Sequence, residues 1–121
     1  MGIKLVLVDD APFIREAIRH ALKDADIEVV GEASDGLEAV EITMKTNPQV
    51  VLMDIVMPKK SGIEASVEIL KKLPHVKIIA CSTVDQETMV MRAIEAGCCG
   101  YVVKPFKIDE LLKAIRNAAK V

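Results

Sequence analysis

Runs of aliphatic residues alternate along the chain with stretches in which apolar residues recur every three or four positions. The runs predict five strands, and several are continuous Val, Ile and Leu segments, as expected for strands buried on both faces. The predicted strands are Ile3–Val8, Ile27–Gly31, Val50–Met53, Lys77–Cys81 and Gly100–Val103.

A helical pattern follows each predicted strand. The first helix begins at Pro12, which a first helical turn tolerates, and Asp85 is the expected N-cap of the fourth. Five such units with short connections predict one α/β domain over residues 1–121, with a parallel sheet and right-handed crossovers. The apolar residues that mark the helices, in chain order, are Ile14, Ala17, Ile18, Ala21 and Leu22; Leu37, Val40 and Met44; Ile63, Val67 and Leu70; Val90, Ala93, Ile94 and Gly97; and Ile108, Leu111, Leu112, Ile115 and Ala119.

Composition narrows the classes of function. The chain is 51% hydrophobic, yet no apolar run approaches the roughly 18 residues of a membrane span. The start lacks a secretory signal, so we expect a cytoplasmic protein. A net charge of −2, one tyrosine, two phenylalanines and no tryptophan argue against binding to nucleic acid or an anionic membrane. The expected partner is a protein or a small ion.

Cysteines and histidines carry no predicted chemistry. Cys81, Cys98 and Cys99 are an odd number without C-x-x-C spacing, which argues against a disulfide framework and a zinc site. Buried, reduced thiols that serve packing are expected instead. His20 and His75 are predicted to be solvated, without partners.

Polar residues stand where the predicted strands end. Because ligands of open α/β sheets bind at the carboxyl ends of the strands, these residues are candidates for a shared site. The strand that ends at Gly31 contributes none and is expected at an edge of the sheet. The candidates are Asp9 and Asp10 after the first strand, Asp54 after the third, Ser82 and Thr83 after the fourth, and Lys104 after the fifth.

The acids predict a cation site. Three neighbouring carboxylates cannot all stay ionised without a compensating cation, and a sparse set of oxygen ligands suits Mg²⁺. Taken alone, Asp9 and Asp10 could instead cap a helix with solvated carboxylates. Asp54 favours the cation site, because it ends the apolar run VVLMD, where a lone acid would be unsatisfied.

Two further segments fit such a site. In DIVMPKKSG, Pro58 stiffens a loop that can aim a backbone carbonyl at a metal, and Gly62 allows a tightly packed start to the next helix. In YVVKPF, the Lys104-Pro105 step permits a cis peptide bond. Lys104 alone could be an ordinary surface lysine, but beside three carboxylates it is a credible counter-charge and phosphate contact.

The DD pair, D-x-x-M-P-x-x-x-G from Asp54, a hydroxyl after the fourth strand and K-P-F at Lys104 occur in an order and spacing that cover the whole chain. In these motifs the sequence resembles the receiver domain of bacterial two-component response regulators. In length it is similar to the stand-alone, CheY-like members that act in chemotaxis. The resemblance implies a flavodoxin-like α/β fold, with five parallel strands in the order 2-1-3-4-5 and five helices.

The resemblance also implies roles for the candidate residues. Asp54 would be the phosphoacceptor, attacking a phosphoryl group on the histidine of a partner kinase. Asp10, Asp54 and the backbone carbonyl of Val56 would bind Mg²⁺, with Asp9 holding the ion mostly through water. Lys104 would bind the acyl phosphate and pair with Asp54 in its absence. The protein would be a phosphoacceptor with autocatalytic phosphorylation and dephosphorylation rather than an enzyme.

By the same resemblance, Ser82 would be the switch hydroxyl that moves onto a phosphate oxygen, and Tyr101 the aromatic residue that then turns inward. Thr83 is bulkier than the usual residue there and is a secondary candidate for the switch. Val56 and Val84 are apolar where many relatives are polar, so they give less help in orienting an attacking water. We therefore predict slow self-dephosphorylation.

The signalling surface of such domains is the face of the fourth helix, fifth strand and fifth helix, where Met91, Arg92 and Glu95 are expected to point outward. Cys99-Gly100 precedes Tyr101 where dimerising receivers carry an acid, so we expect a monomer, with a phosphorylation-dependent dimer as the alternative. The expected partners are a histidine kinase and a protein target such as a flagellar motor switch or a phosphorelay protein, with no nucleic acid bound directly and no membrane.

Other functions stay open. The chain could be a receiver excised from a DNA-binding response regulator, or a pseudo-receiver that binds partners without phosphorylation. An Asp-nucleophile phosphatase of the haloacid-dehalogenase type would need D-x-D after the first strand, where this chain has DDAP. A dinucleotide-binding enzyme would need G-x-G-x-x-G there.

Overall fold

A parallel sheet of five strands, in the order β2-β1-β3-β4-β5, organises residues 2–83 and 87–120, the part of the chain that the computed structural model describes. The predicted fold class, strand order and edge position of β2 are confirmed. No helix in these residues is long and apolar enough to cross a membrane. The elements are β1 (Ile3–Val8), α1 (Pro12–Leu22), β2 (Ile27–Ala33), α2 (Gly36–Thr46), β3 (Val50–Asp54), α3 (Gly62–Lys72), β4 (Lys77–Thr83), α4 (Glu87–Glu95), β5 (Gly100–Lys104) and α5 (Ile108–Ala119).

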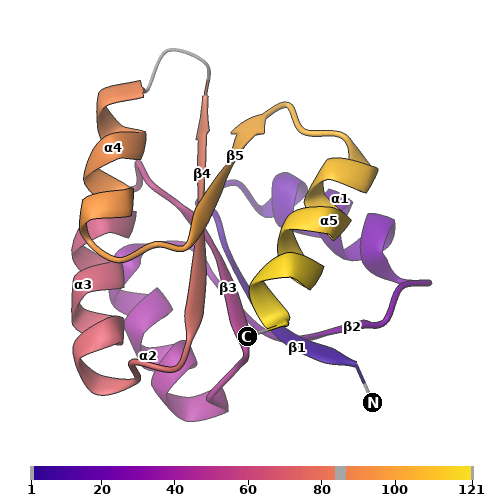
Figure 1. The fold of residues 1–121 in the computed structure, drawn as a ribbon, viewed down its shortest axis with the longest axis horizontal. Helices are drawn as coiled ribbons and strands as arrows, with labels where there is room; N and C mark the ends of the chain where they lie inside the picture. Colours follow the sequence, from indigo (N-terminus) through magenta and orange to yellow (C-terminus); the bar gives the residue numbers. More distant parts are fainter. Residues whose placement is uncertain (1, 84–86, 121) are drawn as a thin grey trace.

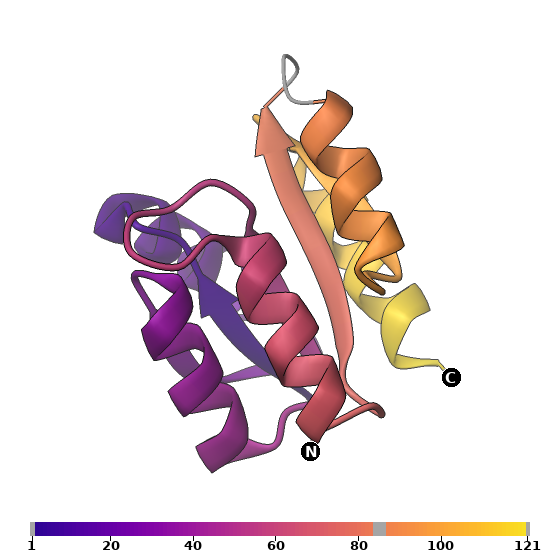
Figure 2. The ribbon, with the colours of Figure 1, turned by 90° about the vertical axis from the view of Figure 1, so that its left-hand side faces the viewer.

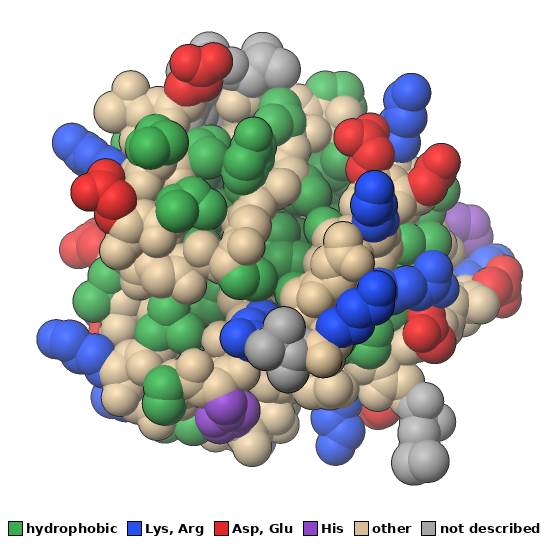
Figure 3. All heavy atoms as spheres, viewed as in Figure 1, with side chains coloured by type: hydrophobic (Ala, Val, Ile, Leu, Met, Phe, Trp, Pro, Cys, Tyr) green, Lys and Arg blue, Asp and Glu red, His purple; other side chains and the backbone are tan. Residues whose placement is uncertain are grey.

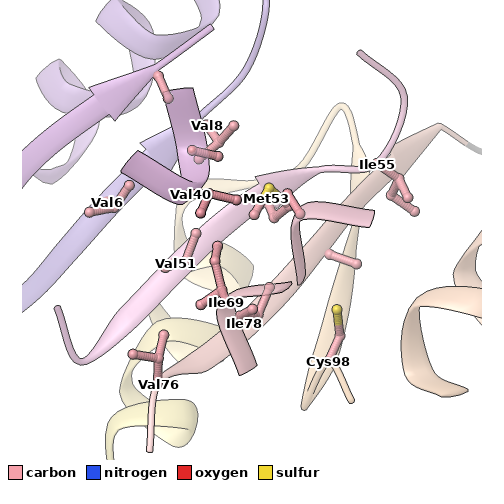
Figure 4. Packing of buried hydrophobic residues seen from close by; sticks show 14 of the residues in the cluster. Val6, Val8, Val40, Val51, Met53, Ile55, Ile69, Val76, Ile78 and Cys98 are labelled. Atoms are coloured by element: carbon pink, nitrogen blue, oxygen red, sulfur yellow. The ribbon is translucent and has the colours of Figure 1, made fainter. Parts of the chain in front are cut away.

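Helices cover both faces of the sheet, with α1 and α5 on one side and α2, α3 and α4 on the other (Figures 1 and 2). Successive strand residues point to opposite faces, so each strand contributes to two cores. In β1, Val6 and Val8 face α2 and α3, whereas Leu5 and Leu7 face α1 and α5. Figure 4 shows the first of these cores.

Four strands run further than their apolar residues indicate. The ladder continues through the polar residues, pairing Asp54 with Cys81 and Thr83 with Lys104. The candidate side chains Asp54, Ser82 and Lys104 therefore belong to the strands themselves rather than to the loops after them. This placement matters because backbone hydrogen bonds to neighbouring strands hold them in position.

Several apolar residues that mark the helices in the sequence lie outside the core. In α2 and α3 the buried positions are instead mostly small ones, including Gly36, Ala39, Ala65 and Ser66, which let the two helices pack closely together. A pattern based on large apolar residues overlooks such contacts. The exposed markers are Ala17, Ala21, Leu37, Met44, Val67, Ile94 and Ile108.

Three smaller predictions are wrong. Helix α4 ends at Glu95, and Gly97 follows it with a φ of 111°, in the left-handed region that favours glycine. Cys99 is exposed rather than packed, whereas its neighbour Cys98 is buried. The Nε2 atom of His75 lies 2.7 Å from the Oδ1 atom of Asn47, so this histidine has a partner.

Other predictions hold or fall outside the described residues. Cys81 and Cys98 are buried free thiols. The predicted N-cap Asp85, and Val84, lie outside the described residues.

The orientation of α3 can be tested with two substitutions. Replacing Ile69, which is fully buried, with Ala should cost about 2–5 kcal/mol of unfolding free energy, because it leaves a cavity. Replacing Val67, which is 40% exposed, with Ala should cost less than about 0.5 kcal/mol. Urea unfolding measures both, and comparable losses would contradict this orientation.

Candidate functional site

Three carboxylates meet at the carboxyl edge of the sheet. Asp9 and Asp10 follow β1 directly, Asp54 ends the adjacent β3, and one oxygen of each lies within 4.8 Å of the others. Asp9 is 4% exposed and Asp54 is 7% exposed, while Asp10 faces solvent. Clustered carboxylate oxygens with one open side are a donor set that suits a hard divalent cation such as Mg²⁺.

Lys104 provides a positive charge to this cluster from β5. Its Nζ atom donates a hydrogen bond of 2.6 Å to the Oδ2 atom of Asp9 and lies 3.5 Å from the Oδ2 atom of Asp54. The ion pair expected with Asp54 is therefore present, but Asp9 is the closer partner. The other oxygen of Asp9 accepts a 2.9 Å hydrogen bond from the backbone N–H of Ala11. Asp9 is thus held on both sides.

Burial and the neighbouring charges change the pKa values of Asp54 and Lys104. Burial raises the pKa of Asp54 to about 6, with Asp9 and Asp10 adding to the rise and Lys104 opposing it. Burial acts to lower the pKa of Lys104, but its hydrogen bond to Asp9 and the charge of Asp54 together raise it above its ordinary value. Ionisation of Asp54 therefore costs free energy in this structure, and a bound cation would lower that cost.

A buried hydroxyl borders the acids. Ser82 is 1% exposed, and its Oγ atom finds no hydrogen-bond partner among the described residues. An orphaned buried hydroxyl is costly, so its presence calls for an explanation such as an additional ligand. Thr83, the next residue, is exposed.

Tyr101 shares a face of the sheet with Ser82. The register places Tyr101 beside Ala80 and Val103 beside Ser82, and residues two apart in a strand point to the same side. The Tyr101 side chain is 53% exposed and therefore lies outward in this structure.

The loop between β3 and α3 closes tightly on its own base. The backbone N–H of Gly62 donates a 2.9 Å hydrogen bond to the carbonyl of Ile55, and a Cβ at Gly62 would lie 2.0 Å from the carbonyl oxygen of Asp54. The tight packing expected of Gly62 is confirmed. Val56 is 50% exposed, and its N–H points to the Oδ1 atom of Asp54 at 3.4 Å. The Lys104-Pro105 peptide bond is cis.

Sequence reasoning missed Arg15. Its guanidinium donates to the backbone carbonyl of Asp9 and, through Nε, to the Oε1 atom of Glu32 at 3.0 Å. Arg15 thereby ties α1 and β2 to the turn that carries two of the acids. Its only sequence signal is its position in the first turns of a helix after Asp10, which does not distinguish it from a surface arginine.

Asp54→Asn should stabilise the metal-free protein by about 2 kcal/mol near neutral pH, because the buried charge is removed. Between the ordinary pKa of 3.8 and about 6, the folded protein retains a proton that the unfolded chain releases. Wild-type stability should therefore fall as the pH rises through this window, and the variant should lack this loss. Urea unfolding in EDTA at about pH 4.5 and about pH 7.5 measures it. The same stability difference at both pH values would contradict the assignment.

Comparisons with known proteins agree with this geometry. A family model described as the response regulator receiver domain matches residues 5–116. The chemotaxis protein CheY of Listeria monocytogenes is 46% identical over 118 residues, which cover 98% of this chain and 99% of that protein. The uncharacterized transcriptional regulatory protein YxjL of Bacillus subtilis is 42% identical over 98% of this chain, but the match covers only 55% of YxjL.

Solved structures show the same fold. The response regulator domain of Thermotoga maritima CheB has a TM-score of 0.89 and 33% sequence identity, and the match covers 100% of this chain and 98% of that one. The chain therefore belongs to the receiver-domain family of two-component response regulators, with the flavodoxin-like fold of its CheY-like members.

Proposed function

We propose that this receiver domain accepts a phosphoryl group on Asp54 from a histidine kinase, in a reaction that depends on Mg²⁺. The observation that carries the proposal is a buried aspartate at a strand end, with two further carboxylates and one lysine around it. The resemblance in sequence and the family membership support the same assignment.

The chemistry needs the ionised carboxylate of Asp54 as nucleophile. One of its oxygens attacks phosphorus, the bond between phosphorus and the histidine nitrogen breaks, and the electron pair stays on the imidazole. Lys104, 3.5 Å from the Asp54 oxygen, is placed to pair with the added phosphate. Asp10, Asp54 and the Val56 carbonyl would hold Mg²⁺, with Asp9 holding it mostly through water, and the ion would neutralise charge on the transferring oxygens. Hydrolysis restores Asp54, so the domain is a phosphoacceptor rather than a turnover enzyme.

We propose that Ser82 and Tyr101 transmit the change. The Ser82 hydroxyl, which has no hydrogen-bond partner among the described residues, would donate a hydrogen bond to a phosphate oxygen. The movement would open space for Tyr101, which now lies outward on the same sheet face. Phosphorylation would thus be converted into a change of shape at the surface around β5.

The target-binding surface is proposed on α4, β5 and α5. Met91, Ile94, Tyr101 and Ile108 are exposed there, and Figure 3 shows hydrophobic side chains gathered over this face. Arg92 and Glu95 are exposed as well. A protein target such as a flagellar motor switch or a phosphorelay protein fits this surface, with the domain acting as a monomer in the cytoplasm.

Relatives named as chemotaxis proteins favour a stand-alone chemotaxis regulator. The match to only 55% of a transcriptional regulator supports the second candidate, a receiver that belongs to a longer DNA-binding regulator. The full reading frame distinguishes the two.

Incubation with acetyl phosphate and Mg²⁺ should add the mass of one phosphoryl group to the intact protein. Asp54→Asn should abolish the gain, and EDTA or Asp10→Asn should slow it by about tenfold or more, because the cation site is lost. Asp24→Asn, which removes an exposed acid after α1, is the matched control and should react normally. An unmodified wild-type mass, or a gain that survives Asp54→Asn, would refute the proposal.

The phosphorylated protein should lose its phosphate slowly, because exposed Val56 offers no polar group to orient an attacking water. Val56→Asn should shorten the phosphate lifetime several-fold, and Val56→Ala should leave it nearly unchanged. Decay of the phosphorylated mass after removal of acetyl phosphate measures the lifetime. A wild-type lifetime of only seconds would be incompatible with this role of Val56.

A further inference from the structure

The turn between β2 and α2 holds the loop that follows Asp54. The backbone N–H of Gly36 donates a 3.0 Å hydrogen bond to the carbonyl of Lys60, near the end of that loop. The Nζ atom of Lys59 lies 3.5 Å from the Oδ2 atom of Asp35. Asp35 and Gly36, at the start of α2, thus contact Lys59 and Lys60 of the loop.

Gly36 leaves no room for a side chain. A Cβ at this position would lie 2.1 Å from the carbonyl oxygen of Lys60 and 2.6 Å from its carbonyl carbon. The atoms in the way are backbone atoms, so rotation of a side chain cannot relieve the overlap. Any larger residue must push the loop away from α2.

Asp35 is itself held in a fixed position at the start of α2. It is 4% exposed and caps α2, accepting a 2.9 Å hydrogen bond from the backbone N–H of Glu38. Its second oxygen faces Lys59, which has a φ of 67°, a left-handed conformation that a lysine adopts at some cost. The contact with Asp35 helps to offset that cost.

The other end of the loop is anchored at Asp54 itself. Ile55 is buried, its N–H donates to the carbonyl of Cys81, and its carbonyl accepts from Gly62. Val56 lies between this anchor and the contacts at Lys59 and Lys60. The path of the backbone at Val56 therefore depends on both ends being held.

We propose that Gly36 and Asp35 are positioning residues for the phosphorylation site. They fix the loop of residues 55–61 so that the backbone carbonyl of Val56 can bind the cation at the carboxylate cluster. This inference rests on the proposed function. Neither residue contacts a reacting group; both act through Lys59 and Lys60.

Gly36→Ala is the direct test. The Mg²⁺ dissociation constant, measured by isothermal titration calorimetry, should rise by about tenfold, as for other positioning contacts behind a metal site. Gly100→Ala makes the same chemical change where a Cβ meets nothing within 4 Å, and should leave the constant unchanged. In the metal-free protein, amide hydrogen exchange at residue 36 should accelerate in Gly36→Ala.

A purely structural effect is separated by Ile69→Ala. This variant lowers stability but leaves the hydrogen bonds and the ion pair that hold the loop in place, so its Mg²⁺ affinity should match that of the wild type although its urea midpoint falls. Asp35→Asn keeps an acceptor for the α2 cap but removes the charge facing Lys59, and should weaken Mg²⁺ binding by about two- to threefold. If Gly36→Ala does not fold, unchanged affinity in Asp35→Asn overturns the inference.

The outcomes separate the two proposals. If the wild type binds Mg²⁺ and gains phosphate while Gly36→Ala matches Gly100→Ala, the positioning role is overturned and the proposed function stands. If the wild type binds no Mg²⁺ and gains no phosphate, the function fails, and the inference that rests on it fails too.

Discussion

The burial of the Asp54 carboxylate beside two other carboxylates, at one edge of the sheet, is the constraint on which this site depends. Adjacent parallel strands end at the same edge, so β1 and β3 bring Asp9, Asp10 and Asp54 together, and Lys104 offsets only part of the charge. Burial is the main cause of the raised pKa of Asp54, and the charges of Asp9 and Asp10 add to it. A domain can hold such a cluster because two continuous apolar cores, one on each face of the sheet, stabilise the strands beneath it.

The same imbalance explains how a small chemical event could have a large effect. Asp54 is a buried acid with too little counter-charge, and Ser82 is a buried hydroxyl with no hydrogen-bond partner among the described residues. Each group lacks something that a cation or a phosphate oxygen supplies. A group that lacks a counter-charge or a hydrogen bond gains more free energy from a ligand than a group that is already satisfied. A ligand shifts a two-state equilibrium only through such a difference in binding free energy.

Sequence reasoning succeeded where the chemistry is local and failed where packing decides. Asp54 could be predicted because an acid that ends an apolar run has few structural explanations, and Lys104 could be predicted from its place at the same sheet edge as the three acids. The buried faces of α2 and α3 could not, because Gly36, Ala39, Ala65 and Ser66 form them while the larger Leu37 and Val67 face outward. The contact of Arg15 with the Asp9 carbonyl, and the closer pairing of Lys104 with Asp9 than with Asp54, depend on distances between elements that no local pattern records.

The proposed switch needs one fixed side and one side that can move, and we assign these roles to different strands. Toward α2, the loop after Asp54 is fixed by the hydrogen bond that the backbone N–H of Gly36 donates to the carbonyl of Lys60, a contact that the missing side chain of Gly36 permits. Toward β4 and β5, the Ser82 hydroxyl has no hydrogen-bond partner among the described residues, and Tyr101 is half exposed on the edge strand. If Asp54 accepts a phosphoryl group as proposed, the fixed loop would keep the added charge in one place, and the structural change would occur on the opposite side of the site. The proposed target surface includes β5, the strand that pairs with β4, so a shift at Ser82 would reach this surface through the neighbouring strand.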